Sequence, residues 1–315
     1  MKIEELSIKE KIGQMVMIGL DTNYITDRIK NMIQNYKIGG VILYRKNFST
    51  YQDMLKLIKE LKELNKDNKI PLFIAIDQEG GRVNRMPKEI KNLPSANLIA
   101  TVGGKELVSE SANVIGELLY KSGFNLNFAP VLDIKRFNDK TAIGDRSYGT
   151  DKDIVTACGI NPIEQAIKNG ADAVLVGHLL ITNVTGVFPA SLSRRFITKY
   201  LRVKYRYKGL IITDDLKMRA IKFMYGPSLA VRKAFEAGND IIVFRFNKDE
   251  EKSVLDKIIN LTTVGKIKES RINRSVKRII QIKQKYGISD TKEFAGVDIN
   301  KINEKIEEIR EKCGI

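Results

Sequence analysis

Hydrophobic residues occur in short continuous runs, separated by longer segments in which hydrophobic positions recur every three or four residues. The runs that predict strands are residues 13–20, 39–44, 71–77, 124–134, 171–181, 209–215 and 239–246. Most are apolar at every position, which is typical of parallel strands covered on both faces. Amphipathic helices are predicted between them, most clearly where Met54, Leu57, Leu61 and Leu64 share a face. The alternation predicts a parallel α/β fold.

Two junctions have the same pattern. "AIKNGADAVLV" and "AFEAGNDIIVF" each predict a helix that ends at a glycine, followed by an aspartate and then a buried strand. This is the helix-to-strand half of a repeated strand–helix unit.

Seven strands are one fewer than the eight that close a (β/α) barrel. Between Ile134 and Ala171 there is room for a loop and about one helix, but not for a further strand and helix. We therefore expect an α/β fold, a (β/α) TIM-type barrel that is one strand–helix unit short. The segment from about Lys266 predicts two helices outside the core. We expect a barrel domain over residues 1–290 and a C-terminal helical tail over residues 291–315.

Composition adds few constraints. The 315 residues are 43% hydrophobic and 29% charged, an ordinary globular profile, and no apolar run approaches the ~20 residues of a membrane span. The N-terminus has no signal-peptide pattern, so we expect a cytoplasmic protein without a membrane partner. Cys158 and Cys313 lie far apart and predict neither a disulfide framework nor a metal site. No metal or cofactor is expected.

The net charge of +16 raises the question of nucleic acid. Lysines are spread along the helical segments and mixed with glutamate, as in "MLKLIKELKELNKDNK", and no tight basic run is interleaved with aromatic residues. We expect no nucleic-acid partner and keep a nucleic-acid-associated protein as the weakest alternative. A basic surface also concentrates acidic ligands by long-range attraction.

Polar residues stand where the predicted strands end, namely Asp77, Asp133, His178, Asp214 and Asp215. In a (β/α) barrel the active site gathers at the carboxyl-terminal ends of the strands. The adjacent acids of "LIITDDLKM" are therefore predicted at the mouth of the barrel.

Three further segments carry candidate chemistry. In "IAIDQEGGRVNRM", Asp77 is followed by Gly80 and Gly81, which let the backbone turn sharply, and then by Arg82 and Arg85. "AIGDRSYG" places Arg146 in a glycine-flanked loop, and "PASLS" follows His178. Arginines supply planar, multi-donor recognition of oxygens.

Taken in order, "IGGVILYRKN", "DQEGGRVNR", "NFAPVLDI", "GDRSYG", "PASLS", "IITDDLKM" and "SVKRIIQIKQKYG" resemble the family 3 glycoside hydrolases, in particular the bacterial β-N-acetylglucosaminidases (β-hexosaminidases) that trim peptidoglycan fragments. The resemblance implies that Asp214 is the nucleophile of a retaining hydrolase and that Asp77 holds sugar hydroxyls. It also implies that Arg85, Arg146 and His178 line the sugar pocket.

The sequence departs from the family in one place. The family carries a KHFPGHG segment and an Asp-Ser-His element, which supply a histidine–aspartate acid/base, between "RSYG" and the strand that leads to His178. Here "RSYGTDKDIVTACGI" runs directly into "NPIEQAIKNGADAVLVGH". The absent segment coincides with the missing strand, and Glu79, Asp145 and His178 are the only substitutes that we consider.

Several alternatives stay open. Asp214 would otherwise cap the next helix, Asp77 would be a turn residue, Arg85 and Arg146 would form structural ion pairs, and His178 would be a buried hydrogen-bonded residue. We expect a hydrolase of terminal β-linked N-acetylglucosamine that is impaired by the gap, and the alternative is a catalytically inactive sugar-binding homologue. The strand edge left by the gap would invite pairing with a second copy.

Overall fold

The computed structural model describes residues 3–133, 143–150, 170–245 and 248–315. Its strands are β1 (Val16–Gly19), β2 (Gly40–Ile42), β3 (Phe73–Ile76), β4 (Leu126–Asn127), β5 (Ala173–Val176), β6 (Leu210–Thr213) and β7 (Ile242–Phe244). Each lies within one of the seven predicted runs, and every pairing between them is parallel. The predicted parallel α/β class is confirmed.

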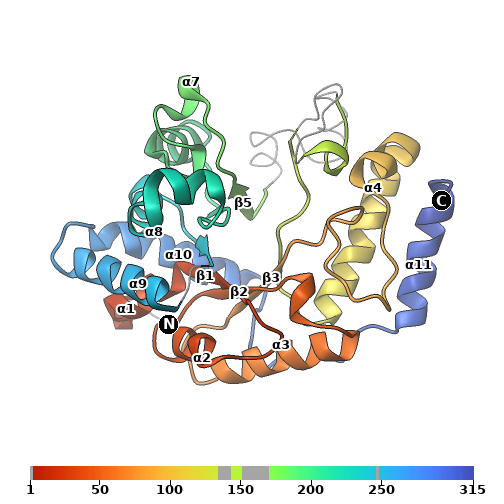
Figure 1. Cartoon of the computed structure of the whole chain (residues 1–315), viewed down its shortest axis with the longest axis horizontal. Helices are drawn as coiled ribbons and strands as arrows, with labels where there is room; N and C mark the ends of the chain where they lie inside the picture. Colours follow the sequence, from red (N-terminus) through yellow and green to blue (C-terminus); the bar gives the residue numbers. More distant parts are fainter. Residues whose placement is uncertain (1–2, 134–142, 151–169, 246–247) are drawn as a thin grey trace.

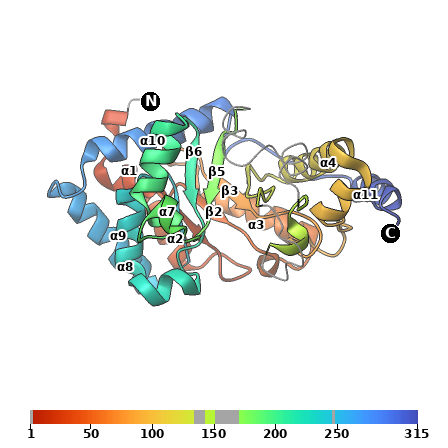
Figure 2. The ribbon, with the colours of Figure 1, turned by 90° about the horizontal axis from the view of Figure 1, so that it is seen from above.

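Five strands form one sheet in the order β4-β3-β2-β1-β7, and β6 and β5 form a second, two-stranded sheet. A parallel bridge between Ile212 and Ile241 joins β6 to the start of β7. Helices surround the strands on the outside, and the two strands β5 and β6 stand to one side of the others (Figures 1 and 2).

The helices are α1 (Ile8–Gln14), α2 (Asp27–Gln34), α3 (Tyr51–Asn65), α4 (Ala96–Lys121), α7 (Thr182–Thr185), α8 (Arg219–Ala237), α9 (Lys248–Thr263), α10 (Glu269–Lys285) and α11 (Ile299–Lys312). Shorter helical turns are η1 (Ile3–Glu5), η2 (Arg45–Asn47), η3 (Gly144–Arg146), η4 (Ala190–Leu192) and the wider η5 (Arg195–Lys204). Helix α3 begins with a capping box between Thr50 and Asp53, which satisfies backbone N–H groups of its first turn.

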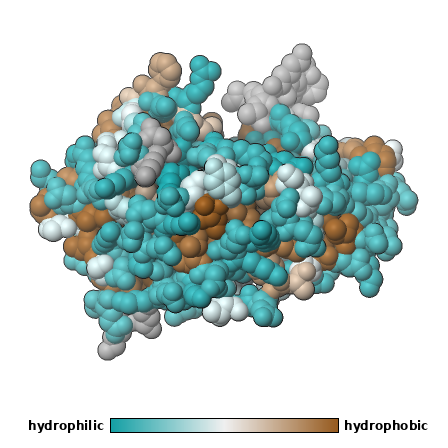
Figure 3. Space-filling view, turned by 60° about the horizontal axis from the view of Figure 1, so that its bottom comes forward, coloured by the Kyte–Doolittle hydropathy of each residue, from teal (hydrophilic) through white to brown (hydrophobic). Residues whose placement is uncertain are grey.

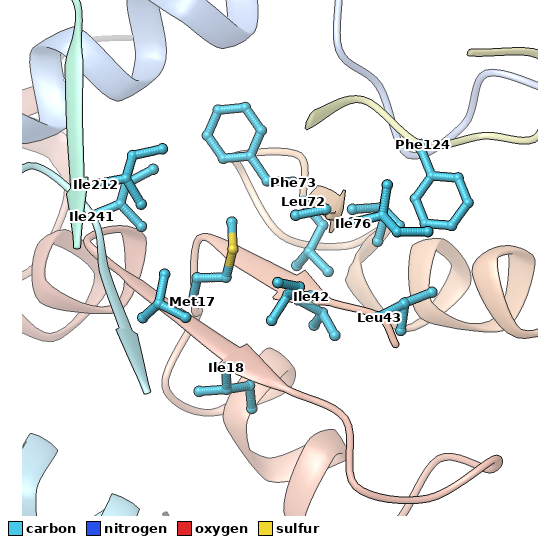
Figure 4. Packing of buried hydrophobic residues seen from close by; sticks show 14 of the residues in the cluster. Met17, Ile18, Ile42, Leu43, Leu72, Phe73, Ile76, Phe124, Ile212 and Ile241 are labelled. Atoms are coloured by element: carbon cyan, nitrogen blue, oxygen red, sulfur yellow. The ribbon is translucent and has the colours of Figure 1, made fainter. Parts of the chain in front are cut away.

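The core lies where the strands are apolar at every position. All residues of β1, β2, β3, β6 and β7 are buried. Figure 4 shows side chains such as Met17, Ile42, Phe73 and Ile212 meeting between the strands. Burying this apolar surface supplies the main favourable free energy of folding, because water no longer contacts it.

The two outer strands differ from the others. Residues of β4 are only partly buried, and in β5 the side chain of Leu175 is 39% exposed. Within the described ranges, no strand joins β4 to β5. Most of the interval between Ile134 and Ala171, where the sequence predicted the missing unit, lies outside the described residues.

Strand β4 is much shorter than the predicted run over residues 124–134. It ends at Asn127, and Pro130 follows in a segment without strand structure. Proline has no N–H to donate to a ladder, so the run is apolar without being a strand. Asp133 therefore lies beyond the strand and not at its tip, which corrects the expectation.

Helix α10 is fastened beneath the amino ends of three strands. The Lys283 side chain, which is almost fully buried, donates hydrogen bonds to the carbonyl oxygens of Gly39 (2.9 Å) and Pro71 (2.6 Å) and to Gln14 Oε1 (3.0 Å). These acceptors immediately precede β2, β3 and β1. The contacts fix where α10 crosses that end of the sheet.

The aspartates of the two repeated junctions also hold α10. Asp240, fully buried before β7, accepts hydrogen bonds from Ser275 and from Arg278 (3.1 Å). Asp172, before β5, pairs with Lys285 at 2.7 Å. Gly238 has a left-handed conformation and ends α8, as predicted. One helix thus contacts the amino ends of strands in both described sheets.

The C-terminal segment forms the two predicted helices, α10 and α11. Helix α11 lies along α4 (Figure 1), with ion pairs from Lys305 to Glu117 (2.5 Å) and from Lys312 to Glu110 (2.7 Å). The boundary near residue 290 stays a prediction. None of the described helices has the length and apolar character to cross a bilayer, and the face seen in Figure 3 is largely hydrophilic.

We predict that Asp240→Ala lowers the free energy of unfolding by about 3–5 kcal/mol, because it leaves the buried guanidinium of Arg202 without its carboxylate partner. Chemical denaturation measures the change. The control is Glu236→Ala, an exposed partner of Arg232, with an expected cost below about 1 kcal/mol. Equal effects of the two substitutions would contradict the role given to Asp240.

Burial lowers the pKa of Lys283 from its usual value to about 7. The unfolded chain therefore binds more protons than the folded protein above this pH. The free energy of unfolding should rise with pH above about 7, by at most about 1.4 kcal/mol per pH unit from this group. Urea denaturation at a series of pH values should show a smaller rise for Lys283→Met than for Lys277→Met, an exposed position on the same helix. If the free energy of unfolding of the two variants changed equally with pH, the lowered pKa of Lys283 would be refuted.

Candidate active site

Functional side chains gather at the carboxyl ends of five strands. Tyr44 follows β2, Asp77 follows β3, His178 follows β5, Asp214 follows β6 and Arg245 follows β7. Parallel strands bring these ends to one side of the sheet. Burial raises the pKa of the Tyr44 hydroxyl, and the charges of Asp215, Asp77 and Asp214 raise it further.

Asp214 is half-buried in the loop after β6. Its backbone N–H donates to Val176 O (3.0 Å), which ties the loop to β5, and its Oδ1 accepts from the N–H of Asp215 (2.7 Å). Helix α8 begins after Met218 without a side-chain cap, so Asp214 does not cap it. No described residue hydrogen-bonds Oδ2, which leaves one carboxylate oxygen available for chemistry.

Asp77 and Arg85 form a bidentate pair. The Arg85 Nε donates to Oδ1 (2.7 Å) and Nη2 donates to Oδ2 (2.5 Å). The turn between them has positive φ at Gly80 (93°) and Gly81 (52°), a conformation that glycine adopts without strain. Arg85 N donates to Gln78 Oε1 (2.7 Å). The turn thus presents Asp77 and Arg85 as one rigid unit.

Arg146 is paired in the same manner with Glu79, whose side chain is 7% exposed. The Arg146 Nε and Nη2 lie 2.9 and 2.7 Å from its two oxygens. Asp145 pairs with Arg82 at 2.8 Å. Both acids that were considered as substitute acid/base groups are therefore held in ion pairs with a guanidinium. The two arginines that were expected in the pocket form ion pairs and remain partly exposed.

His178 has protein partners on both ring nitrogens. Its Nε2 lies 3.0 Å from the carbonyl oxygen of Asp215, and its Nδ1 lies 2.7 Å from the buried Ser191 Oγ. A carbonyl oxygen only accepts, so Nε2 carries the hydrogen and Nδ1 of the neutral ring accepts from the Ser191 hydroxyl. This arrangement fixes the backbone next to Asp214 and leaves His178 no nitrogen for a sugar.

Arg245 and Tyr44 were not recognised from the sequence. The Arg245 guanidinium lies over the Tyr44 ring (4.8 Å to its centre), and its Nε is 3.6 Å from Asp215 Oδ2. A Cβ on Gly19 would meet Arg245 at 2.8 Å, so the strand end needs glycine there. Both residues stand at the end of apolar strands. The same sequence signal, a polar residue where an apolar run stops, identified Asp77 and Asp214.

A cavity of about 600 Å³ adjoins the site at Glu79 and Arg146. Its other walls are mainly apolar residues of α4 and of the segment 124–131. It runs along the outer strand β4, and its lining does not include Asp77 or Asp214. In the described part of the chain, no three His, Cys, Asp or Glu side chains are grouped as a metal site requires.

The geometry agrees with a comparison to known families. The model of the glycosyl hydrolase family 3 N terminal domain matches residues 7–164 and 159–282. The chain belongs to glycosyl hydrolase family 3. It is a glycoside hydrolase by this membership, and the resemblance drawn from the sequence motifs is confirmed.

Individual relatives of this family 3 chain support the same class. A β-N-acetylglucosaminidase structure from Paenibacillus sp. str. FPU-7 is 30% identical, with a TM-score of 0.91 over 98% of this chain and 69% of that one. The β-hexosaminidase LpqI of Mycobacterium tuberculosis is 28% identical over 88% of this chain and 83% of its own length. A β-hexosaminidase of Xylella fastidiosa is 26% identical over 73% of this chain and 82% of its own length.

The match to the family is divided in the region of the predicted gap. Its two parts meet at residues 159–164, between "RSYG" and the strand that leads to His178. The alignment with LpqI extends over 332 positions, more than the 315 residues of this family 3 chain, so the relative carries residues that this chain lacks. Cys158 and the join itself lie outside the described residues.

We predict that the only histidine of the chain is the Nε2–H tautomer when neutral. Nitrogen NMR of histidine-labelled protein gives a single imidazole and measures this directly. Ser191→Ala removes the donor to Nδ1 and should shift the Nδ1 signal, while Ser193→Ala, a buried serine that bonds Thr185, should not. An Nδ1–H tautomer in the unaltered protein would refute the arrangement.

Proposed function

We propose that this glycoside hydrolase removes terminal β-linked N-acetylglucosamine from glycosides such as peptidoglycan fragments, with retention of configuration. The observation that carries the proposal is the Asp214 carboxylate after β6, one oxygen of which has no hydrogen-bond partner among the described residues. Asp77, which follows the parallel strand β3, lies at the same carboxyl-terminal end of the strands. The named activities of the Paenibacillus and Mycobacterium relatives support the substrate class.

Asp214 is the proposed nucleophile. It attacks the anomeric carbon to form a glycosyl ester, and water then hydrolyses that ester. Asp77 is proposed to accept hydrogen bonds from sugar hydroxyls, with Arg85 and Arg146 as the adjoining donors. For His178 we propose a positioning role in place of direct sugar binding, because both of its nitrogens have protein partners.

We further propose that turnover is limited by the absence of an acid/base group. Each of the three substitutes is engaged: Glu79 with Arg146, Asp145 with Arg82, and His178 with Ser191 and Asp215. Without a proton donor, the leaving oxygen departs as an anion, which costs more free energy as its basicity rises. A positioned acid/base typically contributes 10²–10⁴-fold to a rate.

The expected result is selective loss of activity on poor leaving groups. An aryl β-N-acetylglucosaminide should be cleaved, and N,N′-diacetylchitobiose should react slower by about 10²–10⁴-fold in kcat/KM. Asp214→Ala should lower the aryl activity by at least about 10³-fold, while Asp67→Ala, an exposed acid on another loop, should leave it unchanged. Comparable rates on both substrates would refute the missing acid/base, and an active Asp214→Ala would refute the nucleophile.

Calorimetric measurement of N-acetylglucosamine binding distinguishes the proposed hydrolase from the alternative, an inactive sugar-binding homologue. Binding without release of the aryl group from either substrate would favour that alternative, since the pairs around Asp77 and Arg146 are intact. Absence of both binding and cleavage would refute the N-acetylglucosamine assignment itself.

A further inference from the structure

Acidic residues are scarce in one continuous part of the fold. Residues 173–235, which form β5, α7, η4, η5, β6 and all but the end of α8, contain twelve lysines and arginines. The only acids of this range are Asp214 and Asp215, which belong to the candidate active site, and Glu236 follows it at the end of α8. This part of the surface is therefore far more basic than the rest of the molecule.

Large apolar side chains are exposed in the same part, on the two loops that follow β5 and β6. Phe223 is 88% exposed, Val187 80% and Met224 69%. Leu179, Leu180, Ile181 and Met218 are exposed as well. Single exposed apolar residues are common, but a contiguous group of them indicates a binding surface.

The two loops are held side by side. The rings of Phe188 and Tyr225 lie 5.9 Å apart, so the segment after β5 and helix α8 are in contact next to Val187 and Met224 in the chain. Helix α8 packs against both η4 and η5, and Figures 1 and 2 both show α7 and α8 at the same end of the molecule. Non-helical Gly226 separates the first segment of α8 from the rest.

Basic side chains are interleaved with the apolar ones. Lys217, Arg219 and Lys222 are exposed and form no ion pair with any residue in the described ranges. They alternate along the chain with Met218, Phe223 and Met224. We call Val187, Lys217, Met218, Arg219, Lys222, Phe223 and Met224 the apolar–basic rim. It borders the mouth of the barrel, because Lys217 lies two residues beyond Asp215.

We propose that the apolar–basic rim binds the surface of an anionic membrane, with the mouth of the barrel held at the level of the headgroups. Basic residues are attracted to anionic lipids, and exposed aromatic and aliphatic side chains enter the boundary between headgroups and acyl chains. An acidic polymer such as nucleic acid would account for the charge but not for exposed Phe223, Met224 and Val187 together.

The sequence was expected to have no membrane partner, because it lacks a spanning segment. Attachment to one leaflet needs no such segment, since the rim only has to reach the interface. The proposal does not depend on the substrate or on the acid/base assignment. Its failure would leave the proposed function untouched.

The test is sedimentation of the full chain with vesicles of phosphatidylcholine, with or without phosphatidylglycerol, at low and high salt. We expect binding to the anionic vesicles that high salt weakens. Phe223→Ser with Met224→Ser should lower the association constant at least about tenfold. Lys217→Gln with Lys222→Gln should lower it about tenfold.

The matched controls are Val264→Ser, an exposed apolar residue outside the rim, and Lys277→Gln on α10, and neither should change binding. Circular dichroism confirms that each variant is folded. The proposal is overturned if the unaltered chain does not bind anionic vesicles, or if the rim variants bind as well as the controls. Binding of an oligonucleotide without binding of vesicles would also overturn it and would assign the charge to nucleic acid.

Discussion

The attachment of α10 beneath the sheet is the constraint on which the rest of this structure depends. A closed barrel holds its strands in register by pairing all the way round, but the described strands end at β4 on one side and β5 on the other. Lys283 reaches the amino ends of β1, β2 and β3, while Asp240 and Asp172 fasten the same helix to β7 and β5. Hydrogen bonds and ion pairs at the amino ends of the strands thus hold both described sheets to one helix.

The candidate active site lies at the opposite, carboxyl-terminal end of the strands that α10 holds. Asp77 and Asp214 follow β3 and β6, and Arg245, after β7, lies over the ring of Tyr44, after β2. Charges are neutralised locally, since Asp77 and Glu79, around the turn of Gly80 and Gly81, each have their own arginine. Glu79, Asp145 and His178, the groups considered for proton transfer, all have protein partners.

Much of the fold was predictable because burial on both faces leaves a simple pattern. The seven apolar runs contain the seven described strands, and the glycine of the second junction, Gly238, marks the end of α8. Strand length was less predictable. The run after Phe124 is apolar, yet Pro130 and the loop around it leave only Leu126 and Asn127 in the ladder. A hydrophobic pattern reports burial and not hydrogen bonding.

By itself, the sequence determined the family, the fold class and the positions of Asp77 and Asp214, because strand ends and motif order are local properties of the chain. Only the tertiary structure decided what these residues touch. It placed Arg85 on Asp77, gave His178 to Ser191 and the Asp215 carbonyl, and laid Arg245 over Tyr44. Some of these pairings join residues from different strand ends, such as His178 with Asp215 and Arg245 with Tyr44, and their geometry depends on the packing of the strands that carry them.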